Sequence, residues 1–377
     1  MKRLAGLVAV AATAAVAAIA ARAGHEMPVY PSYYPQEIRI EPMAPEAAGA
    51  ALVKNRIQAY VGAMPPPGVD AKAIAAVESL ASFVIVRVNS GSAAAGDDTA
   101  RCALAGKAVA AIAGNAPGFK FHPYPVNPFH ADYFHHFDLA REAAVRFRDQ
   151  TGGKGLRVAA EGRLAEALVR RLGPPSAAAW DVRVEEVDLG RLLHPYRLTG
   201  NGWDGPPWLK EGWFQTYRLL ADGLADEAAK CRAADAVRRL QRGDYATAAE
   251  KINLERHLVG LLTGQCRRVV AGYGIRREYY SAEYSGGVEN VAFDSQDGLN
   301  SAIFIRTVKL KDFPWNGWLT LGVDGAPEAA WNPVAGFTDA AGRLIWHALG
   351  DPAFFPEPYN AGWSMNRIGD VKKAAGR

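Results

Sequence analysis

Residues 119–138, read as FKFHPYPVNPFHADYFHHFD, contain the side chains of this sequence that are best suited to chemistry. Four of the eight histidines fall in this stretch, with two aspartates, three prolines and seven aromatic rings. Residues three and four apart share one face of a helix, so a helical stretch would put Asp132 beside His135 and His136. Carboxylates and imidazoles bind divalent transition metals. The spacing therefore predicts a metal site with the candidate ligands His122, His130, Asp132, His135 and His136.

Two other roles fit the same stretch. Histidines at the edge of an aromatic core often bond to the backbone, and Asp132 could instead orient one histidine for acid or base chemistry. The spacing differs from the HExxH motif of zinc enzymes, so the sequence does not identify a metal. A transition metal is the one cofactor that these residues suggest, and the three roles remain open alternatives.

Residues 194–215 form a second candidate region, because three tryptophans fall within eleven positions. Each buried tryptophan removes about 150–250 Å² from water, so three exposed rings would be costly without a partner. We expect either a packed junction between domains or a ligand-binding face for sugars, aromatic molecules or organic cations. The candidate ligand-binding residues here are Trp203, Asp204, Trp208, Lys210 and Trp213.

Two glutamates, Glu283 and Glu289, flank a Ser-Gly-Gly turn at 285–287. If this turn closes a hairpin, the two carboxylates face each other and are further candidates for ligand binding. Two carboxylates roughly 5–10 Å apart can also hydrolyse glycosides. The simpler alternative is that they form ion pairs with arginines such as Arg276 and Arg277.

The N-terminus has the pattern of a secretion signal. Lys2 and Arg3 precede an unbroken run of small and apolar residues at 4–20, and Ala-Arg-Ala at 21–23 is a small-x-small cleavage site. We therefore expect a cut after Ala23 and a periplasmic or secreted protein. No later stretch approaches 18 consecutive apolar residues, so no membrane span is expected after signal cleavage.

The charge and cysteine content narrow the partners and the compartment. The formal net charge of +4 owes much to three basic residues of the signal, so the mature chain is close to neutral and no nucleic-acid partner is expected. Cys102, Cys231 and Cys266 allow one disulfide in an oxidising compartment, and Cys231–Cys266 would close the shortest loop. A CxxC motif is absent from the sequence.

The alternation of expected elements predicts an α/β fold. Strands are expected over 83–89, 155–162 and 180–189, with helices between them, and the last two strands fit a parallel βαβ unit. An additional helix is expected over 71–82, and a strand over 301–310.

These elements divide the chain into five segments. The fold class that we predict is an α/β N-terminal domain with a mixed or parallel sheet, a helical hairpin insertion and a β-rich C-terminal region. The segments are a signal peptide (1–23), an extended arm rich in proline and tyrosine (24–44), the α/β domain (45–200), a tryptophan-rich junction with a helical segment (201–263), and a β-rich region with a loop-rich tail (264–377).

The functional prediction depends on the absence of intact catalytic motifs. GxSxG, Walker A, HExxH and a complete GxGxxG are all missing from the sequence. We therefore favour an exported, soluble binding or accessory protein that holds a small molecule in an aromatic-lined cleft between lobes. One alternative is a secreted metal-dependent hydrolase or oxidase that uses the cluster at 122–138. Another is a structural protein of a periplasmic complex, with a protein partner bound through the arm.

Overall fold

The computed structural model describes residues 35–65, 73–114, 116–148, 155–170, 179–199, 205–313, 317–327, 339–350 and 352–369. The expected signal peptide (1–23), most of the arm, and two candidate site residues, Trp203 and Asp204, lie outside these ranges. Within the described ranges, no helix is long and apolar enough to cross a membrane.

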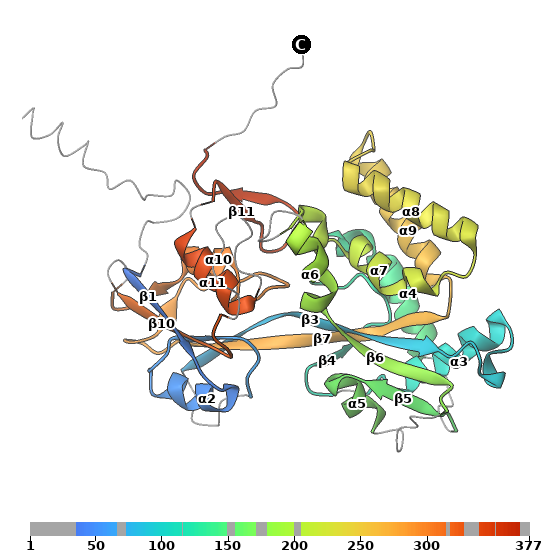
Figure 1. Ribbon diagram of the computed structural model, residues 1–377, viewed down its shortest axis with the longest axis horizontal. Helices are drawn as coiled ribbons and strands as arrows, with labels where there is room; N and C mark the ends of the chain where they lie inside the picture. The colour runs from blue at the N-terminus through green and yellow to red at the C-terminus, as the bar shows by residue number, and fades with distance from the viewer. Residues whose placement is uncertain are drawn as a thin grey trace, which may run out of the picture.

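An eight-stranded mixed β-sheet runs through the molecule, with helices on both faces (Figure 1). The strands β1, β10 and β2 are mutually parallel at one end, and β5 and β6 are parallel at the other. The predicted α/β class is confirmed, and strands from both halves of the sequence share this sheet. In spatial order the strands are β1 (Glu37–Pro42), β10 (Trp318–Val323), β2 (Ala59–Val61), β7 (Arg268–Ser281), β3 (Ile74–Val88), β6 (Val182–Asp188) and β5 (Val158–Glu161), with β4 (Phe119–Phe121) paired on β7.

Two long antiparallel strands, β3 and β7, connect the two ends of the sheet. Along β3, Phe83 and Ile85 face one core, whereas Val84 and Val86 face the other, so this strand is buried on both faces. The pairing of β3 with β7 shifts register between Leu80 and Ser82. The expected helix over 71–82 is wrong, because the alanine-rich residues from Ile74 onward form part of β3 and pair with β7.

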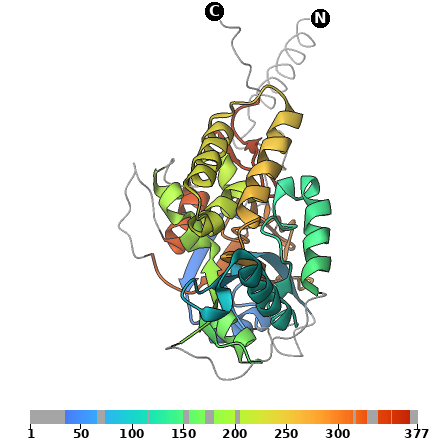
Figure 2. The same cartoon turned by 90° about the vertical axis from the view of Figure 1, so that its right-hand side faces the viewer.

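Helices of the central and later parts of the chain cover the upper face of the sheet in Figure 1. The predicted helical hairpin is formed by α8 and α9, which Figure 2 shows as a pair standing above the sheet. Asp226 caps the start of α8, and Gly243 ends it with a left-handed φ of 68°. The helices of this layer are α4 (Phe137–Arg148), α6 (Leu189–Thr199), α7 (Gly212–Leu220), α8 (Glu227–Arg242) and α9 (Ala248–Thr263).

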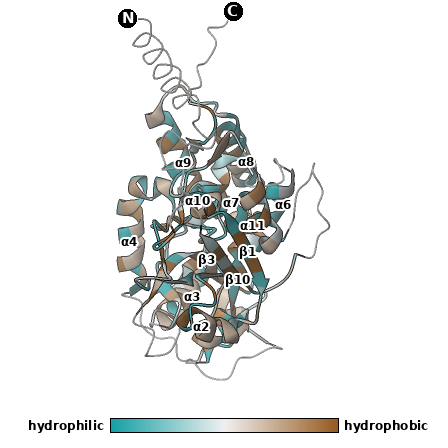
Figure 3. Ribbon diagram, turned by 90° about the vertical axis from the view of Figure 1, so that its left-hand side faces the viewer, coloured by the Kyte–Doolittle hydropathy of each residue, from teal (hydrophilic) through white to brown (hydrophobic). Residues whose placement is uncertain are grey.

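The end of the sheet that carries β1 and β10 faces the viewer in Figure 3. On this side α10 (Ala302–Thr307) and α11 (Ala340–Leu349) pack over the strands. The expected strand over 301–310 is wrong over 302–307, since Ile303, Phe304 and Ile305 are all buried in α10, and only Lys309 and Leu310 form a strand. A short apolar run of this kind has no periodicity that separates a strand from a buried helix.

The remaining described elements are short or lie on the lower face in Figure 1. They are α2 (Pro45–Val53), α3 (Asp98–Ala111) and α5 (Arg163–Val169), the short helices η1 (Ala93–Ala95), η2 (Ala131–His135), η3 (Pro207–Lys210) and η4 (Ala221–Gly223), and the strand pairs β8 (Val288–Glu289) with β9 (Lys309–Leu310) and β11 (Phe354–Pro356) with β12 (Trp363–Met365).

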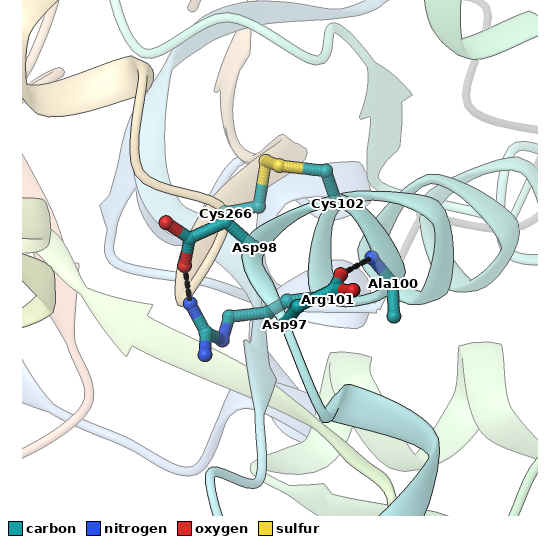
Figure 4. The surroundings of a disulfide bond; sticks show 6 residues. All are labelled: Asp97, Asp98, Ala100, Arg101, Cys102 and Cys266. Carbon is teal, nitrogen blue, oxygen red and sulfur yellow. Dashed lines mark hydrogen bonds and ion pairs between the residues drawn. A yellow bond between two sulfur atoms is a disulfide. The ribbon is translucent and has the colours of Figure 1, made fainter.

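A disulfide joins Cys102 on α3 to Cys266, which lies just before β7 (Figure 4). Of the three pairings that the sequence left open, the structure selects this long-range one, with a sequence separation of 164. Cys231 on α8 is an exposed free thiol. The bond therefore ties the early α/β segment to the start of a strand from the later part of the chain.

Candidate functional site

A cleft of about 740 Å³ opens over the middle of β3 and β7, where the pairing of the two strands shifts register. One wall comes from the ends of β2 and β10, and the opposite wall comes from α5 and β6. Residues from Ala81 to Ser82 and from Gly274 to Arg276 form part of the lining. The cleft therefore lies between the two ends of the sheet, and β3 and β7 run beneath both walls.

Two glutamates tie the walls of this cleft to the sheet. Glu278 on β7 is buried and accepts backbone hydrogen bonds from Gly62 (2.9 Å) and Leu299 (2.7 Å). Burial raises its pKa, and the nearby Arg276 opposes that rise. Glu186 on β6 accepts bonds from the Ser82 hydroxyl (3.0 Å) and from the Leu164 amide (2.8 Å). Both carboxylates are therefore held by hydrogen bonds within the protein, and these bonds position the cleft walls.

Close backbone packing shapes the α5 wall. Gly162, which precedes α5, has a φ of 98°, and a Cβ there would lie 2.6 Å from the Cβ of Glu186. A side chain at this position would meet both a strained backbone and a steric clash. Glycine at this position therefore allows α5 to approach β6. This packing places Arg163 and Arg170 at the cleft.

Charged side chains of opposite sign lie on the two walls without protein partners. Arg163 at the start of α5 and Arg170 just after its end line the cleft, and so does Asp324, which follows β10 beside Gly62. Within the described parts of the chain, these three exposed side chains form no hydrogen bond or ion pair. The described lining contains no aromatic ring. The arginine wall also carries Glu186 and Asp188, whose carboxylates accept hydrogen bonds from neighbouring residues of the protein. The arginines can therefore bind a negative group at one wall, and Asp324 can bind a positive group at the other.

The tryptophan-rich segment lies elsewhere, in the helical layer. Trp213 has no exposed surface, and its indole N–H donates to Glu211. Trp208 packs against Phe214, with ring centroids 4.5 Å apart, and also lines a second cavity of about 620 Å³. Lys210 is engaged in an ion pair with Asp294. The structure thus unites Trp208 and Trp213 in one core cluster.

The other two candidate ligand-binding residues lie on separate surface segments. Glu283 accepts backbone bonds from Ser285 and Gly286 and so closes its own turn. Glu289 is exposed on β8, in register with Lys309 of β9. Neither glutamate lines the central cleft or the second cavity.

The histidines of residues 119–138 diverge. His122 bonds to the Val126 carbonyl oxygen (2.9 Å), while His135 is exposed. His130 is buried, accepts the Asn127 amide (3.0 Å) and donates to the Gln215 side-chain oxygen (2.7 Å). Burial lowers the pKa of His130 to about 4, so its ring is neutral near pH 7. Packing and hydrogen bonding explain His122 and His130, whereas His135 lies at the surface, beside the second cavity.

The remaining pair of the predicted metal set, Asp132 and His136, lies together with Glu255 of α9. All three residues are buried, and one potential ligand atom from each lies within 4.8 Å of the others. Sequence reasoning missed Glu255 because it is distant in the chain. A signal was available, since Glu255 shares a helical face with the buried Leu258, Val259 and Leu262.

Comparisons with known proteins give a fold-level likeness only. No family model and no curated protein matches this sequence. Among solved structures, NikZ from Campylobacter jejuni in complex with Ni(L-His) is 13% identical, with a TM-score of 0.35 over 68% of this chain and 58% of its own. The oligopeptide-binding protein AppA from Bacillus subtilis, in complex with a nonapeptide, is 12% identical, with a TM-score of 0.38 over 71% and 59%. DppA from Helicobacter pylori, an ABC transporter-associated periplasmic binding protein in complex with the peptide STSA, is 14% identical, with a TM-score of 0.38 over 71% and 56%.

This chain therefore spans less than two thirds of the length of each of these proteins. With TM-scores below 0.5, the likenesses do not define the class of this protein. The functional argument consequently depends on the residues of the central cleft.

Proposed function

We propose that this chain is an exported binding protein that holds a small zwitterionic molecule in the central cleft. The observation that carries the proposal is the pair of opposite walls, with Arg163 and Arg170 on one and Asp324 on the other, all three without partners among the residues that the structure describes. Ligand sites usually hold a small number of charged or polar groups that orient the ligand, and three charged side chains that converge on one cavity from opposite walls can do so for a molecule with both signs of charge.

The cavity size supports a small molecule. A volume of about 740 Å³ falls within the range of roughly 300–1,000 Å³ that is typical of small-molecule sites. A ligand with a carboxylate and an ammonium group, such as an amino acid or a short peptide with free termini, would place its carboxylate against the arginines. Its ammonium group would then lie beside Asp324.

Export is supported by two independent features. The N-terminal charged and apolar runs with the Ala-Arg-Ala site have the pattern of a cleaved signal. The Cys102–Cys266 disulfide suits an oxidising compartment such as the periplasm. The expected aromatic lining is replaced in this proposal by a charged lining, because the described tryptophans of residues 194–215 lie outside the cleft.

The experiment is a binding measurement with charged and blocked probes. The purified chain is titrated calorimetrically with pools of free amino acids and of tripeptides with free termini, and then with N-acetylated and C-amidated versions. We expect binding of at least one free-terminus pool, and an affinity about tenfold lower or worse when either terminal charge is blocked. The reason is that each blocked end leaves one wall of the cleft without its counter-ion.

Substitutions of the charged cleft residues test whether the ligand binds in the cleft. Arg163→Gln with Arg170→Gln, and separately Asp324→Asn, should each weaken binding by about tenfold or more. Arg141→Gln with Arg238→Gln, and separately Asp312→Asn, are controls of the same charge change at exposed sites outside the cleft, and they should bind as the parent does. Failure of every zwitterionic pool to bind, or equal binding by the cleft variants and the controls, would overturn the proposal.

A further inference from the structure

A second cluster of chemistry-bearing side chains lies in the helical layer, away from the central cleft. Asp132 on η2, His136 at the start of α4 and Glu255 on α9 are each less than a tenth exposed, with relative exposures of 6%, 0% and 1%. Their potential ligand atoms all lie within 4.8 Å of one another. Asp132 and Glu255 also line the second cavity of about 620 Å³, so the cluster is reachable from that space.

His136 has a ring nitrogen without a partner. Its Nδ1 forms a hydrogen bond of 2.8 Å with the Tyr124 hydroxyl. Its Nε2 is buried and makes no hydrogen bond to the described protein. When Nδ1 carries the proton and donates it to Tyr124, Nε2 presents a free lone pair.

The charges in the cluster do not balance. The carboxylates of Asp132, Glu211 and Glu255 are buried, and the ammonium group of Lys251 is the cation between Glu211 and Glu255. Arg256, the next residue on α9, forms a bidentate ion pair with Asp138, in which both N···O distances are 2.7 Å. Buried carboxylates of like charge repel one another when they are ionised, and a bound cation would offset this repulsion, which the one lysine does only in part.

Asp132 is held rigidly for such a role. Its carboxylate accepts the backbone amides of Gly212 (3.0 Å) and Trp213 (3.3 Å) at the start of α7. Gly212 allows this approach, because a Cβ there would lie 2.6 Å from Val126. Because these backbone amides already fix the orientation of the carboxylate, Asp132 would lose little conformational freedom when it binds a cation.

We propose that Asp132, His136 and Glu255 bind one divalent transition-metal ion, with a coordination position open toward the second cavity. One imidazole with two carboxylates suits Zn²⁺, Mn²⁺ or Fe²⁺. In a tetrahedral site with bonds of about 2.0–2.1 Å, neighbouring ligand atoms lie roughly 3.4 Å apart. The observed separations of up to 4.8 Å are therefore closed by small side-chain rotations. This site is independent of the central cleft and of the ligand proposed there.

The test is metal binding by the full chain. After treatment with EDTA and transfer to metal-free buffer, the protein is titrated calorimetrically with Zn²⁺ and with Mn²⁺, and the absorption of bound Co²⁺ reports on nitrogen ligation. We expect one ion per chain. His136→Gln and Glu255→Gln should each weaken binding by about 100-fold or more, and Tyr124→Phe by about tenfold, because Tyr124 orients the imidazole.

The controls separate a metal site from a general effect on folding. His257→Gln on α9 changes an exposed histidine two residues from Glu255 and should bind the ion as the parent does. Lys251→Met removes the competing positive charge and should tighten binding, a gain that a misfolded variant would not produce. Circular dichroism of each variant verifies its fold.

Three results would overturn the proposal. They are the absence of Zn²⁺ and Mn²⁺ binding by the parent, unchanged binding in folded His136→Gln and Glu255→Gln, and weaker binding in folded Lys251→Met. The last result would mean that Lys251 supports the cation rather than competing with it. None of these outcomes depends on the ligand of the central cleft, so this proposal and the proposed function can fail separately.

Discussion

Removal of the Cys102–Cys266 disulfide provides a quantitative prediction for stability. The bond closes a loop with a sequence separation of 164. In the chain-entropy model, a loop of this length removes about 17 cal/mol/K from the unfolded chain, or about 5 kcal/mol at 25 °C. Replacing both cysteines by alanine should therefore lower the free energy of unfolding by about 3–5 kcal/mol, because measured effects tend to fall below the model.

The assay is urea unfolding followed by both tryptophan fluorescence and circular dichroism, with the parent in its oxidised form. A Cys231→Ser variant is the matched control, since this exposed thiol takes no part in the bond and should leave stability within about 0.5 kcal/mol. Thiol titration of the unfolded, unreduced parent should detect one reactive group per chain, and reduction should raise that number to three.

Two results would refute the reasoning. A double alanine variant within about 1 kcal/mol of the parent would mean that the unfolded chain is already restricted around these positions. A titration in which Cys231 is blocked and another cysteine is free would show a different pairing.

Three further predictions concern single positions, each measured by urea unfolding. Trp213→Ala removes a fully buried ring and should cost about 3–5 kcal/mol, whereas a loss below about 1 kcal/mol would contradict its place in the core. Asp297→Asn should cost about 3 kcal/mol at neutral pH, because Asp297 pairs with Arg197 (2.8 and 2.9 Å) and with Arg343. Burial alone would raise the pKa of Asp297, but the two arginines lower it overall. The stabilisation by Asp297 is therefore complete above the ordinary carboxyl pKa of about 4 and is lost as the pH falls further. If the difference in unfolding free energy between parent and variant grew in acid, this reasoning would be wrong. Gly243→Ala should cost about 1 kcal/mol, since this residue has a left-handed φ of 68° in open space, and an unchanged stability would mean that the end of α8 rearranges.

The local elements were largely predictable from the sequence, because their signals are local. The β-branched run from Phe83 onward forms part of β3, and the strand, helix and strand over 155–189 form the expected parallel unit of β5, α5 and β6. The two errors, over 71–82 and 301–310, fall on short segments whose state is decided by neighbours. Alanine-rich β3 joins a ladder with β7, and apolar α10 is buried on all sides.

The sites were harder to predict, because each is assembled from distant residues. The proposed metal cluster needs Glu255, which follows His136 by more than a hundred positions. The cleft needs Asp324 opposite Arg163 and Arg170, a relation that depends on which strands pair across the sheet. Hydrophobic pattern identifies strands but not their order, so no local signal could have placed these three side chains at one cavity.

The position of β7 in the sheet has a consequence for how the chain is made. This strand lies between β2 and β3, yet β3 ends at Val88 and β7 begins only at Arg268. A growing chain therefore contains β2, β3 and β4 long before the strand to which all three pair has left the ribosome. Such late, non-local pairing delays folding, and a shorter chain that ends before Arg268 should remain unfolded and bind chaperones. For the export that we propose, the same delay would keep most of the polypeptide unfolded until it has crossed the membrane.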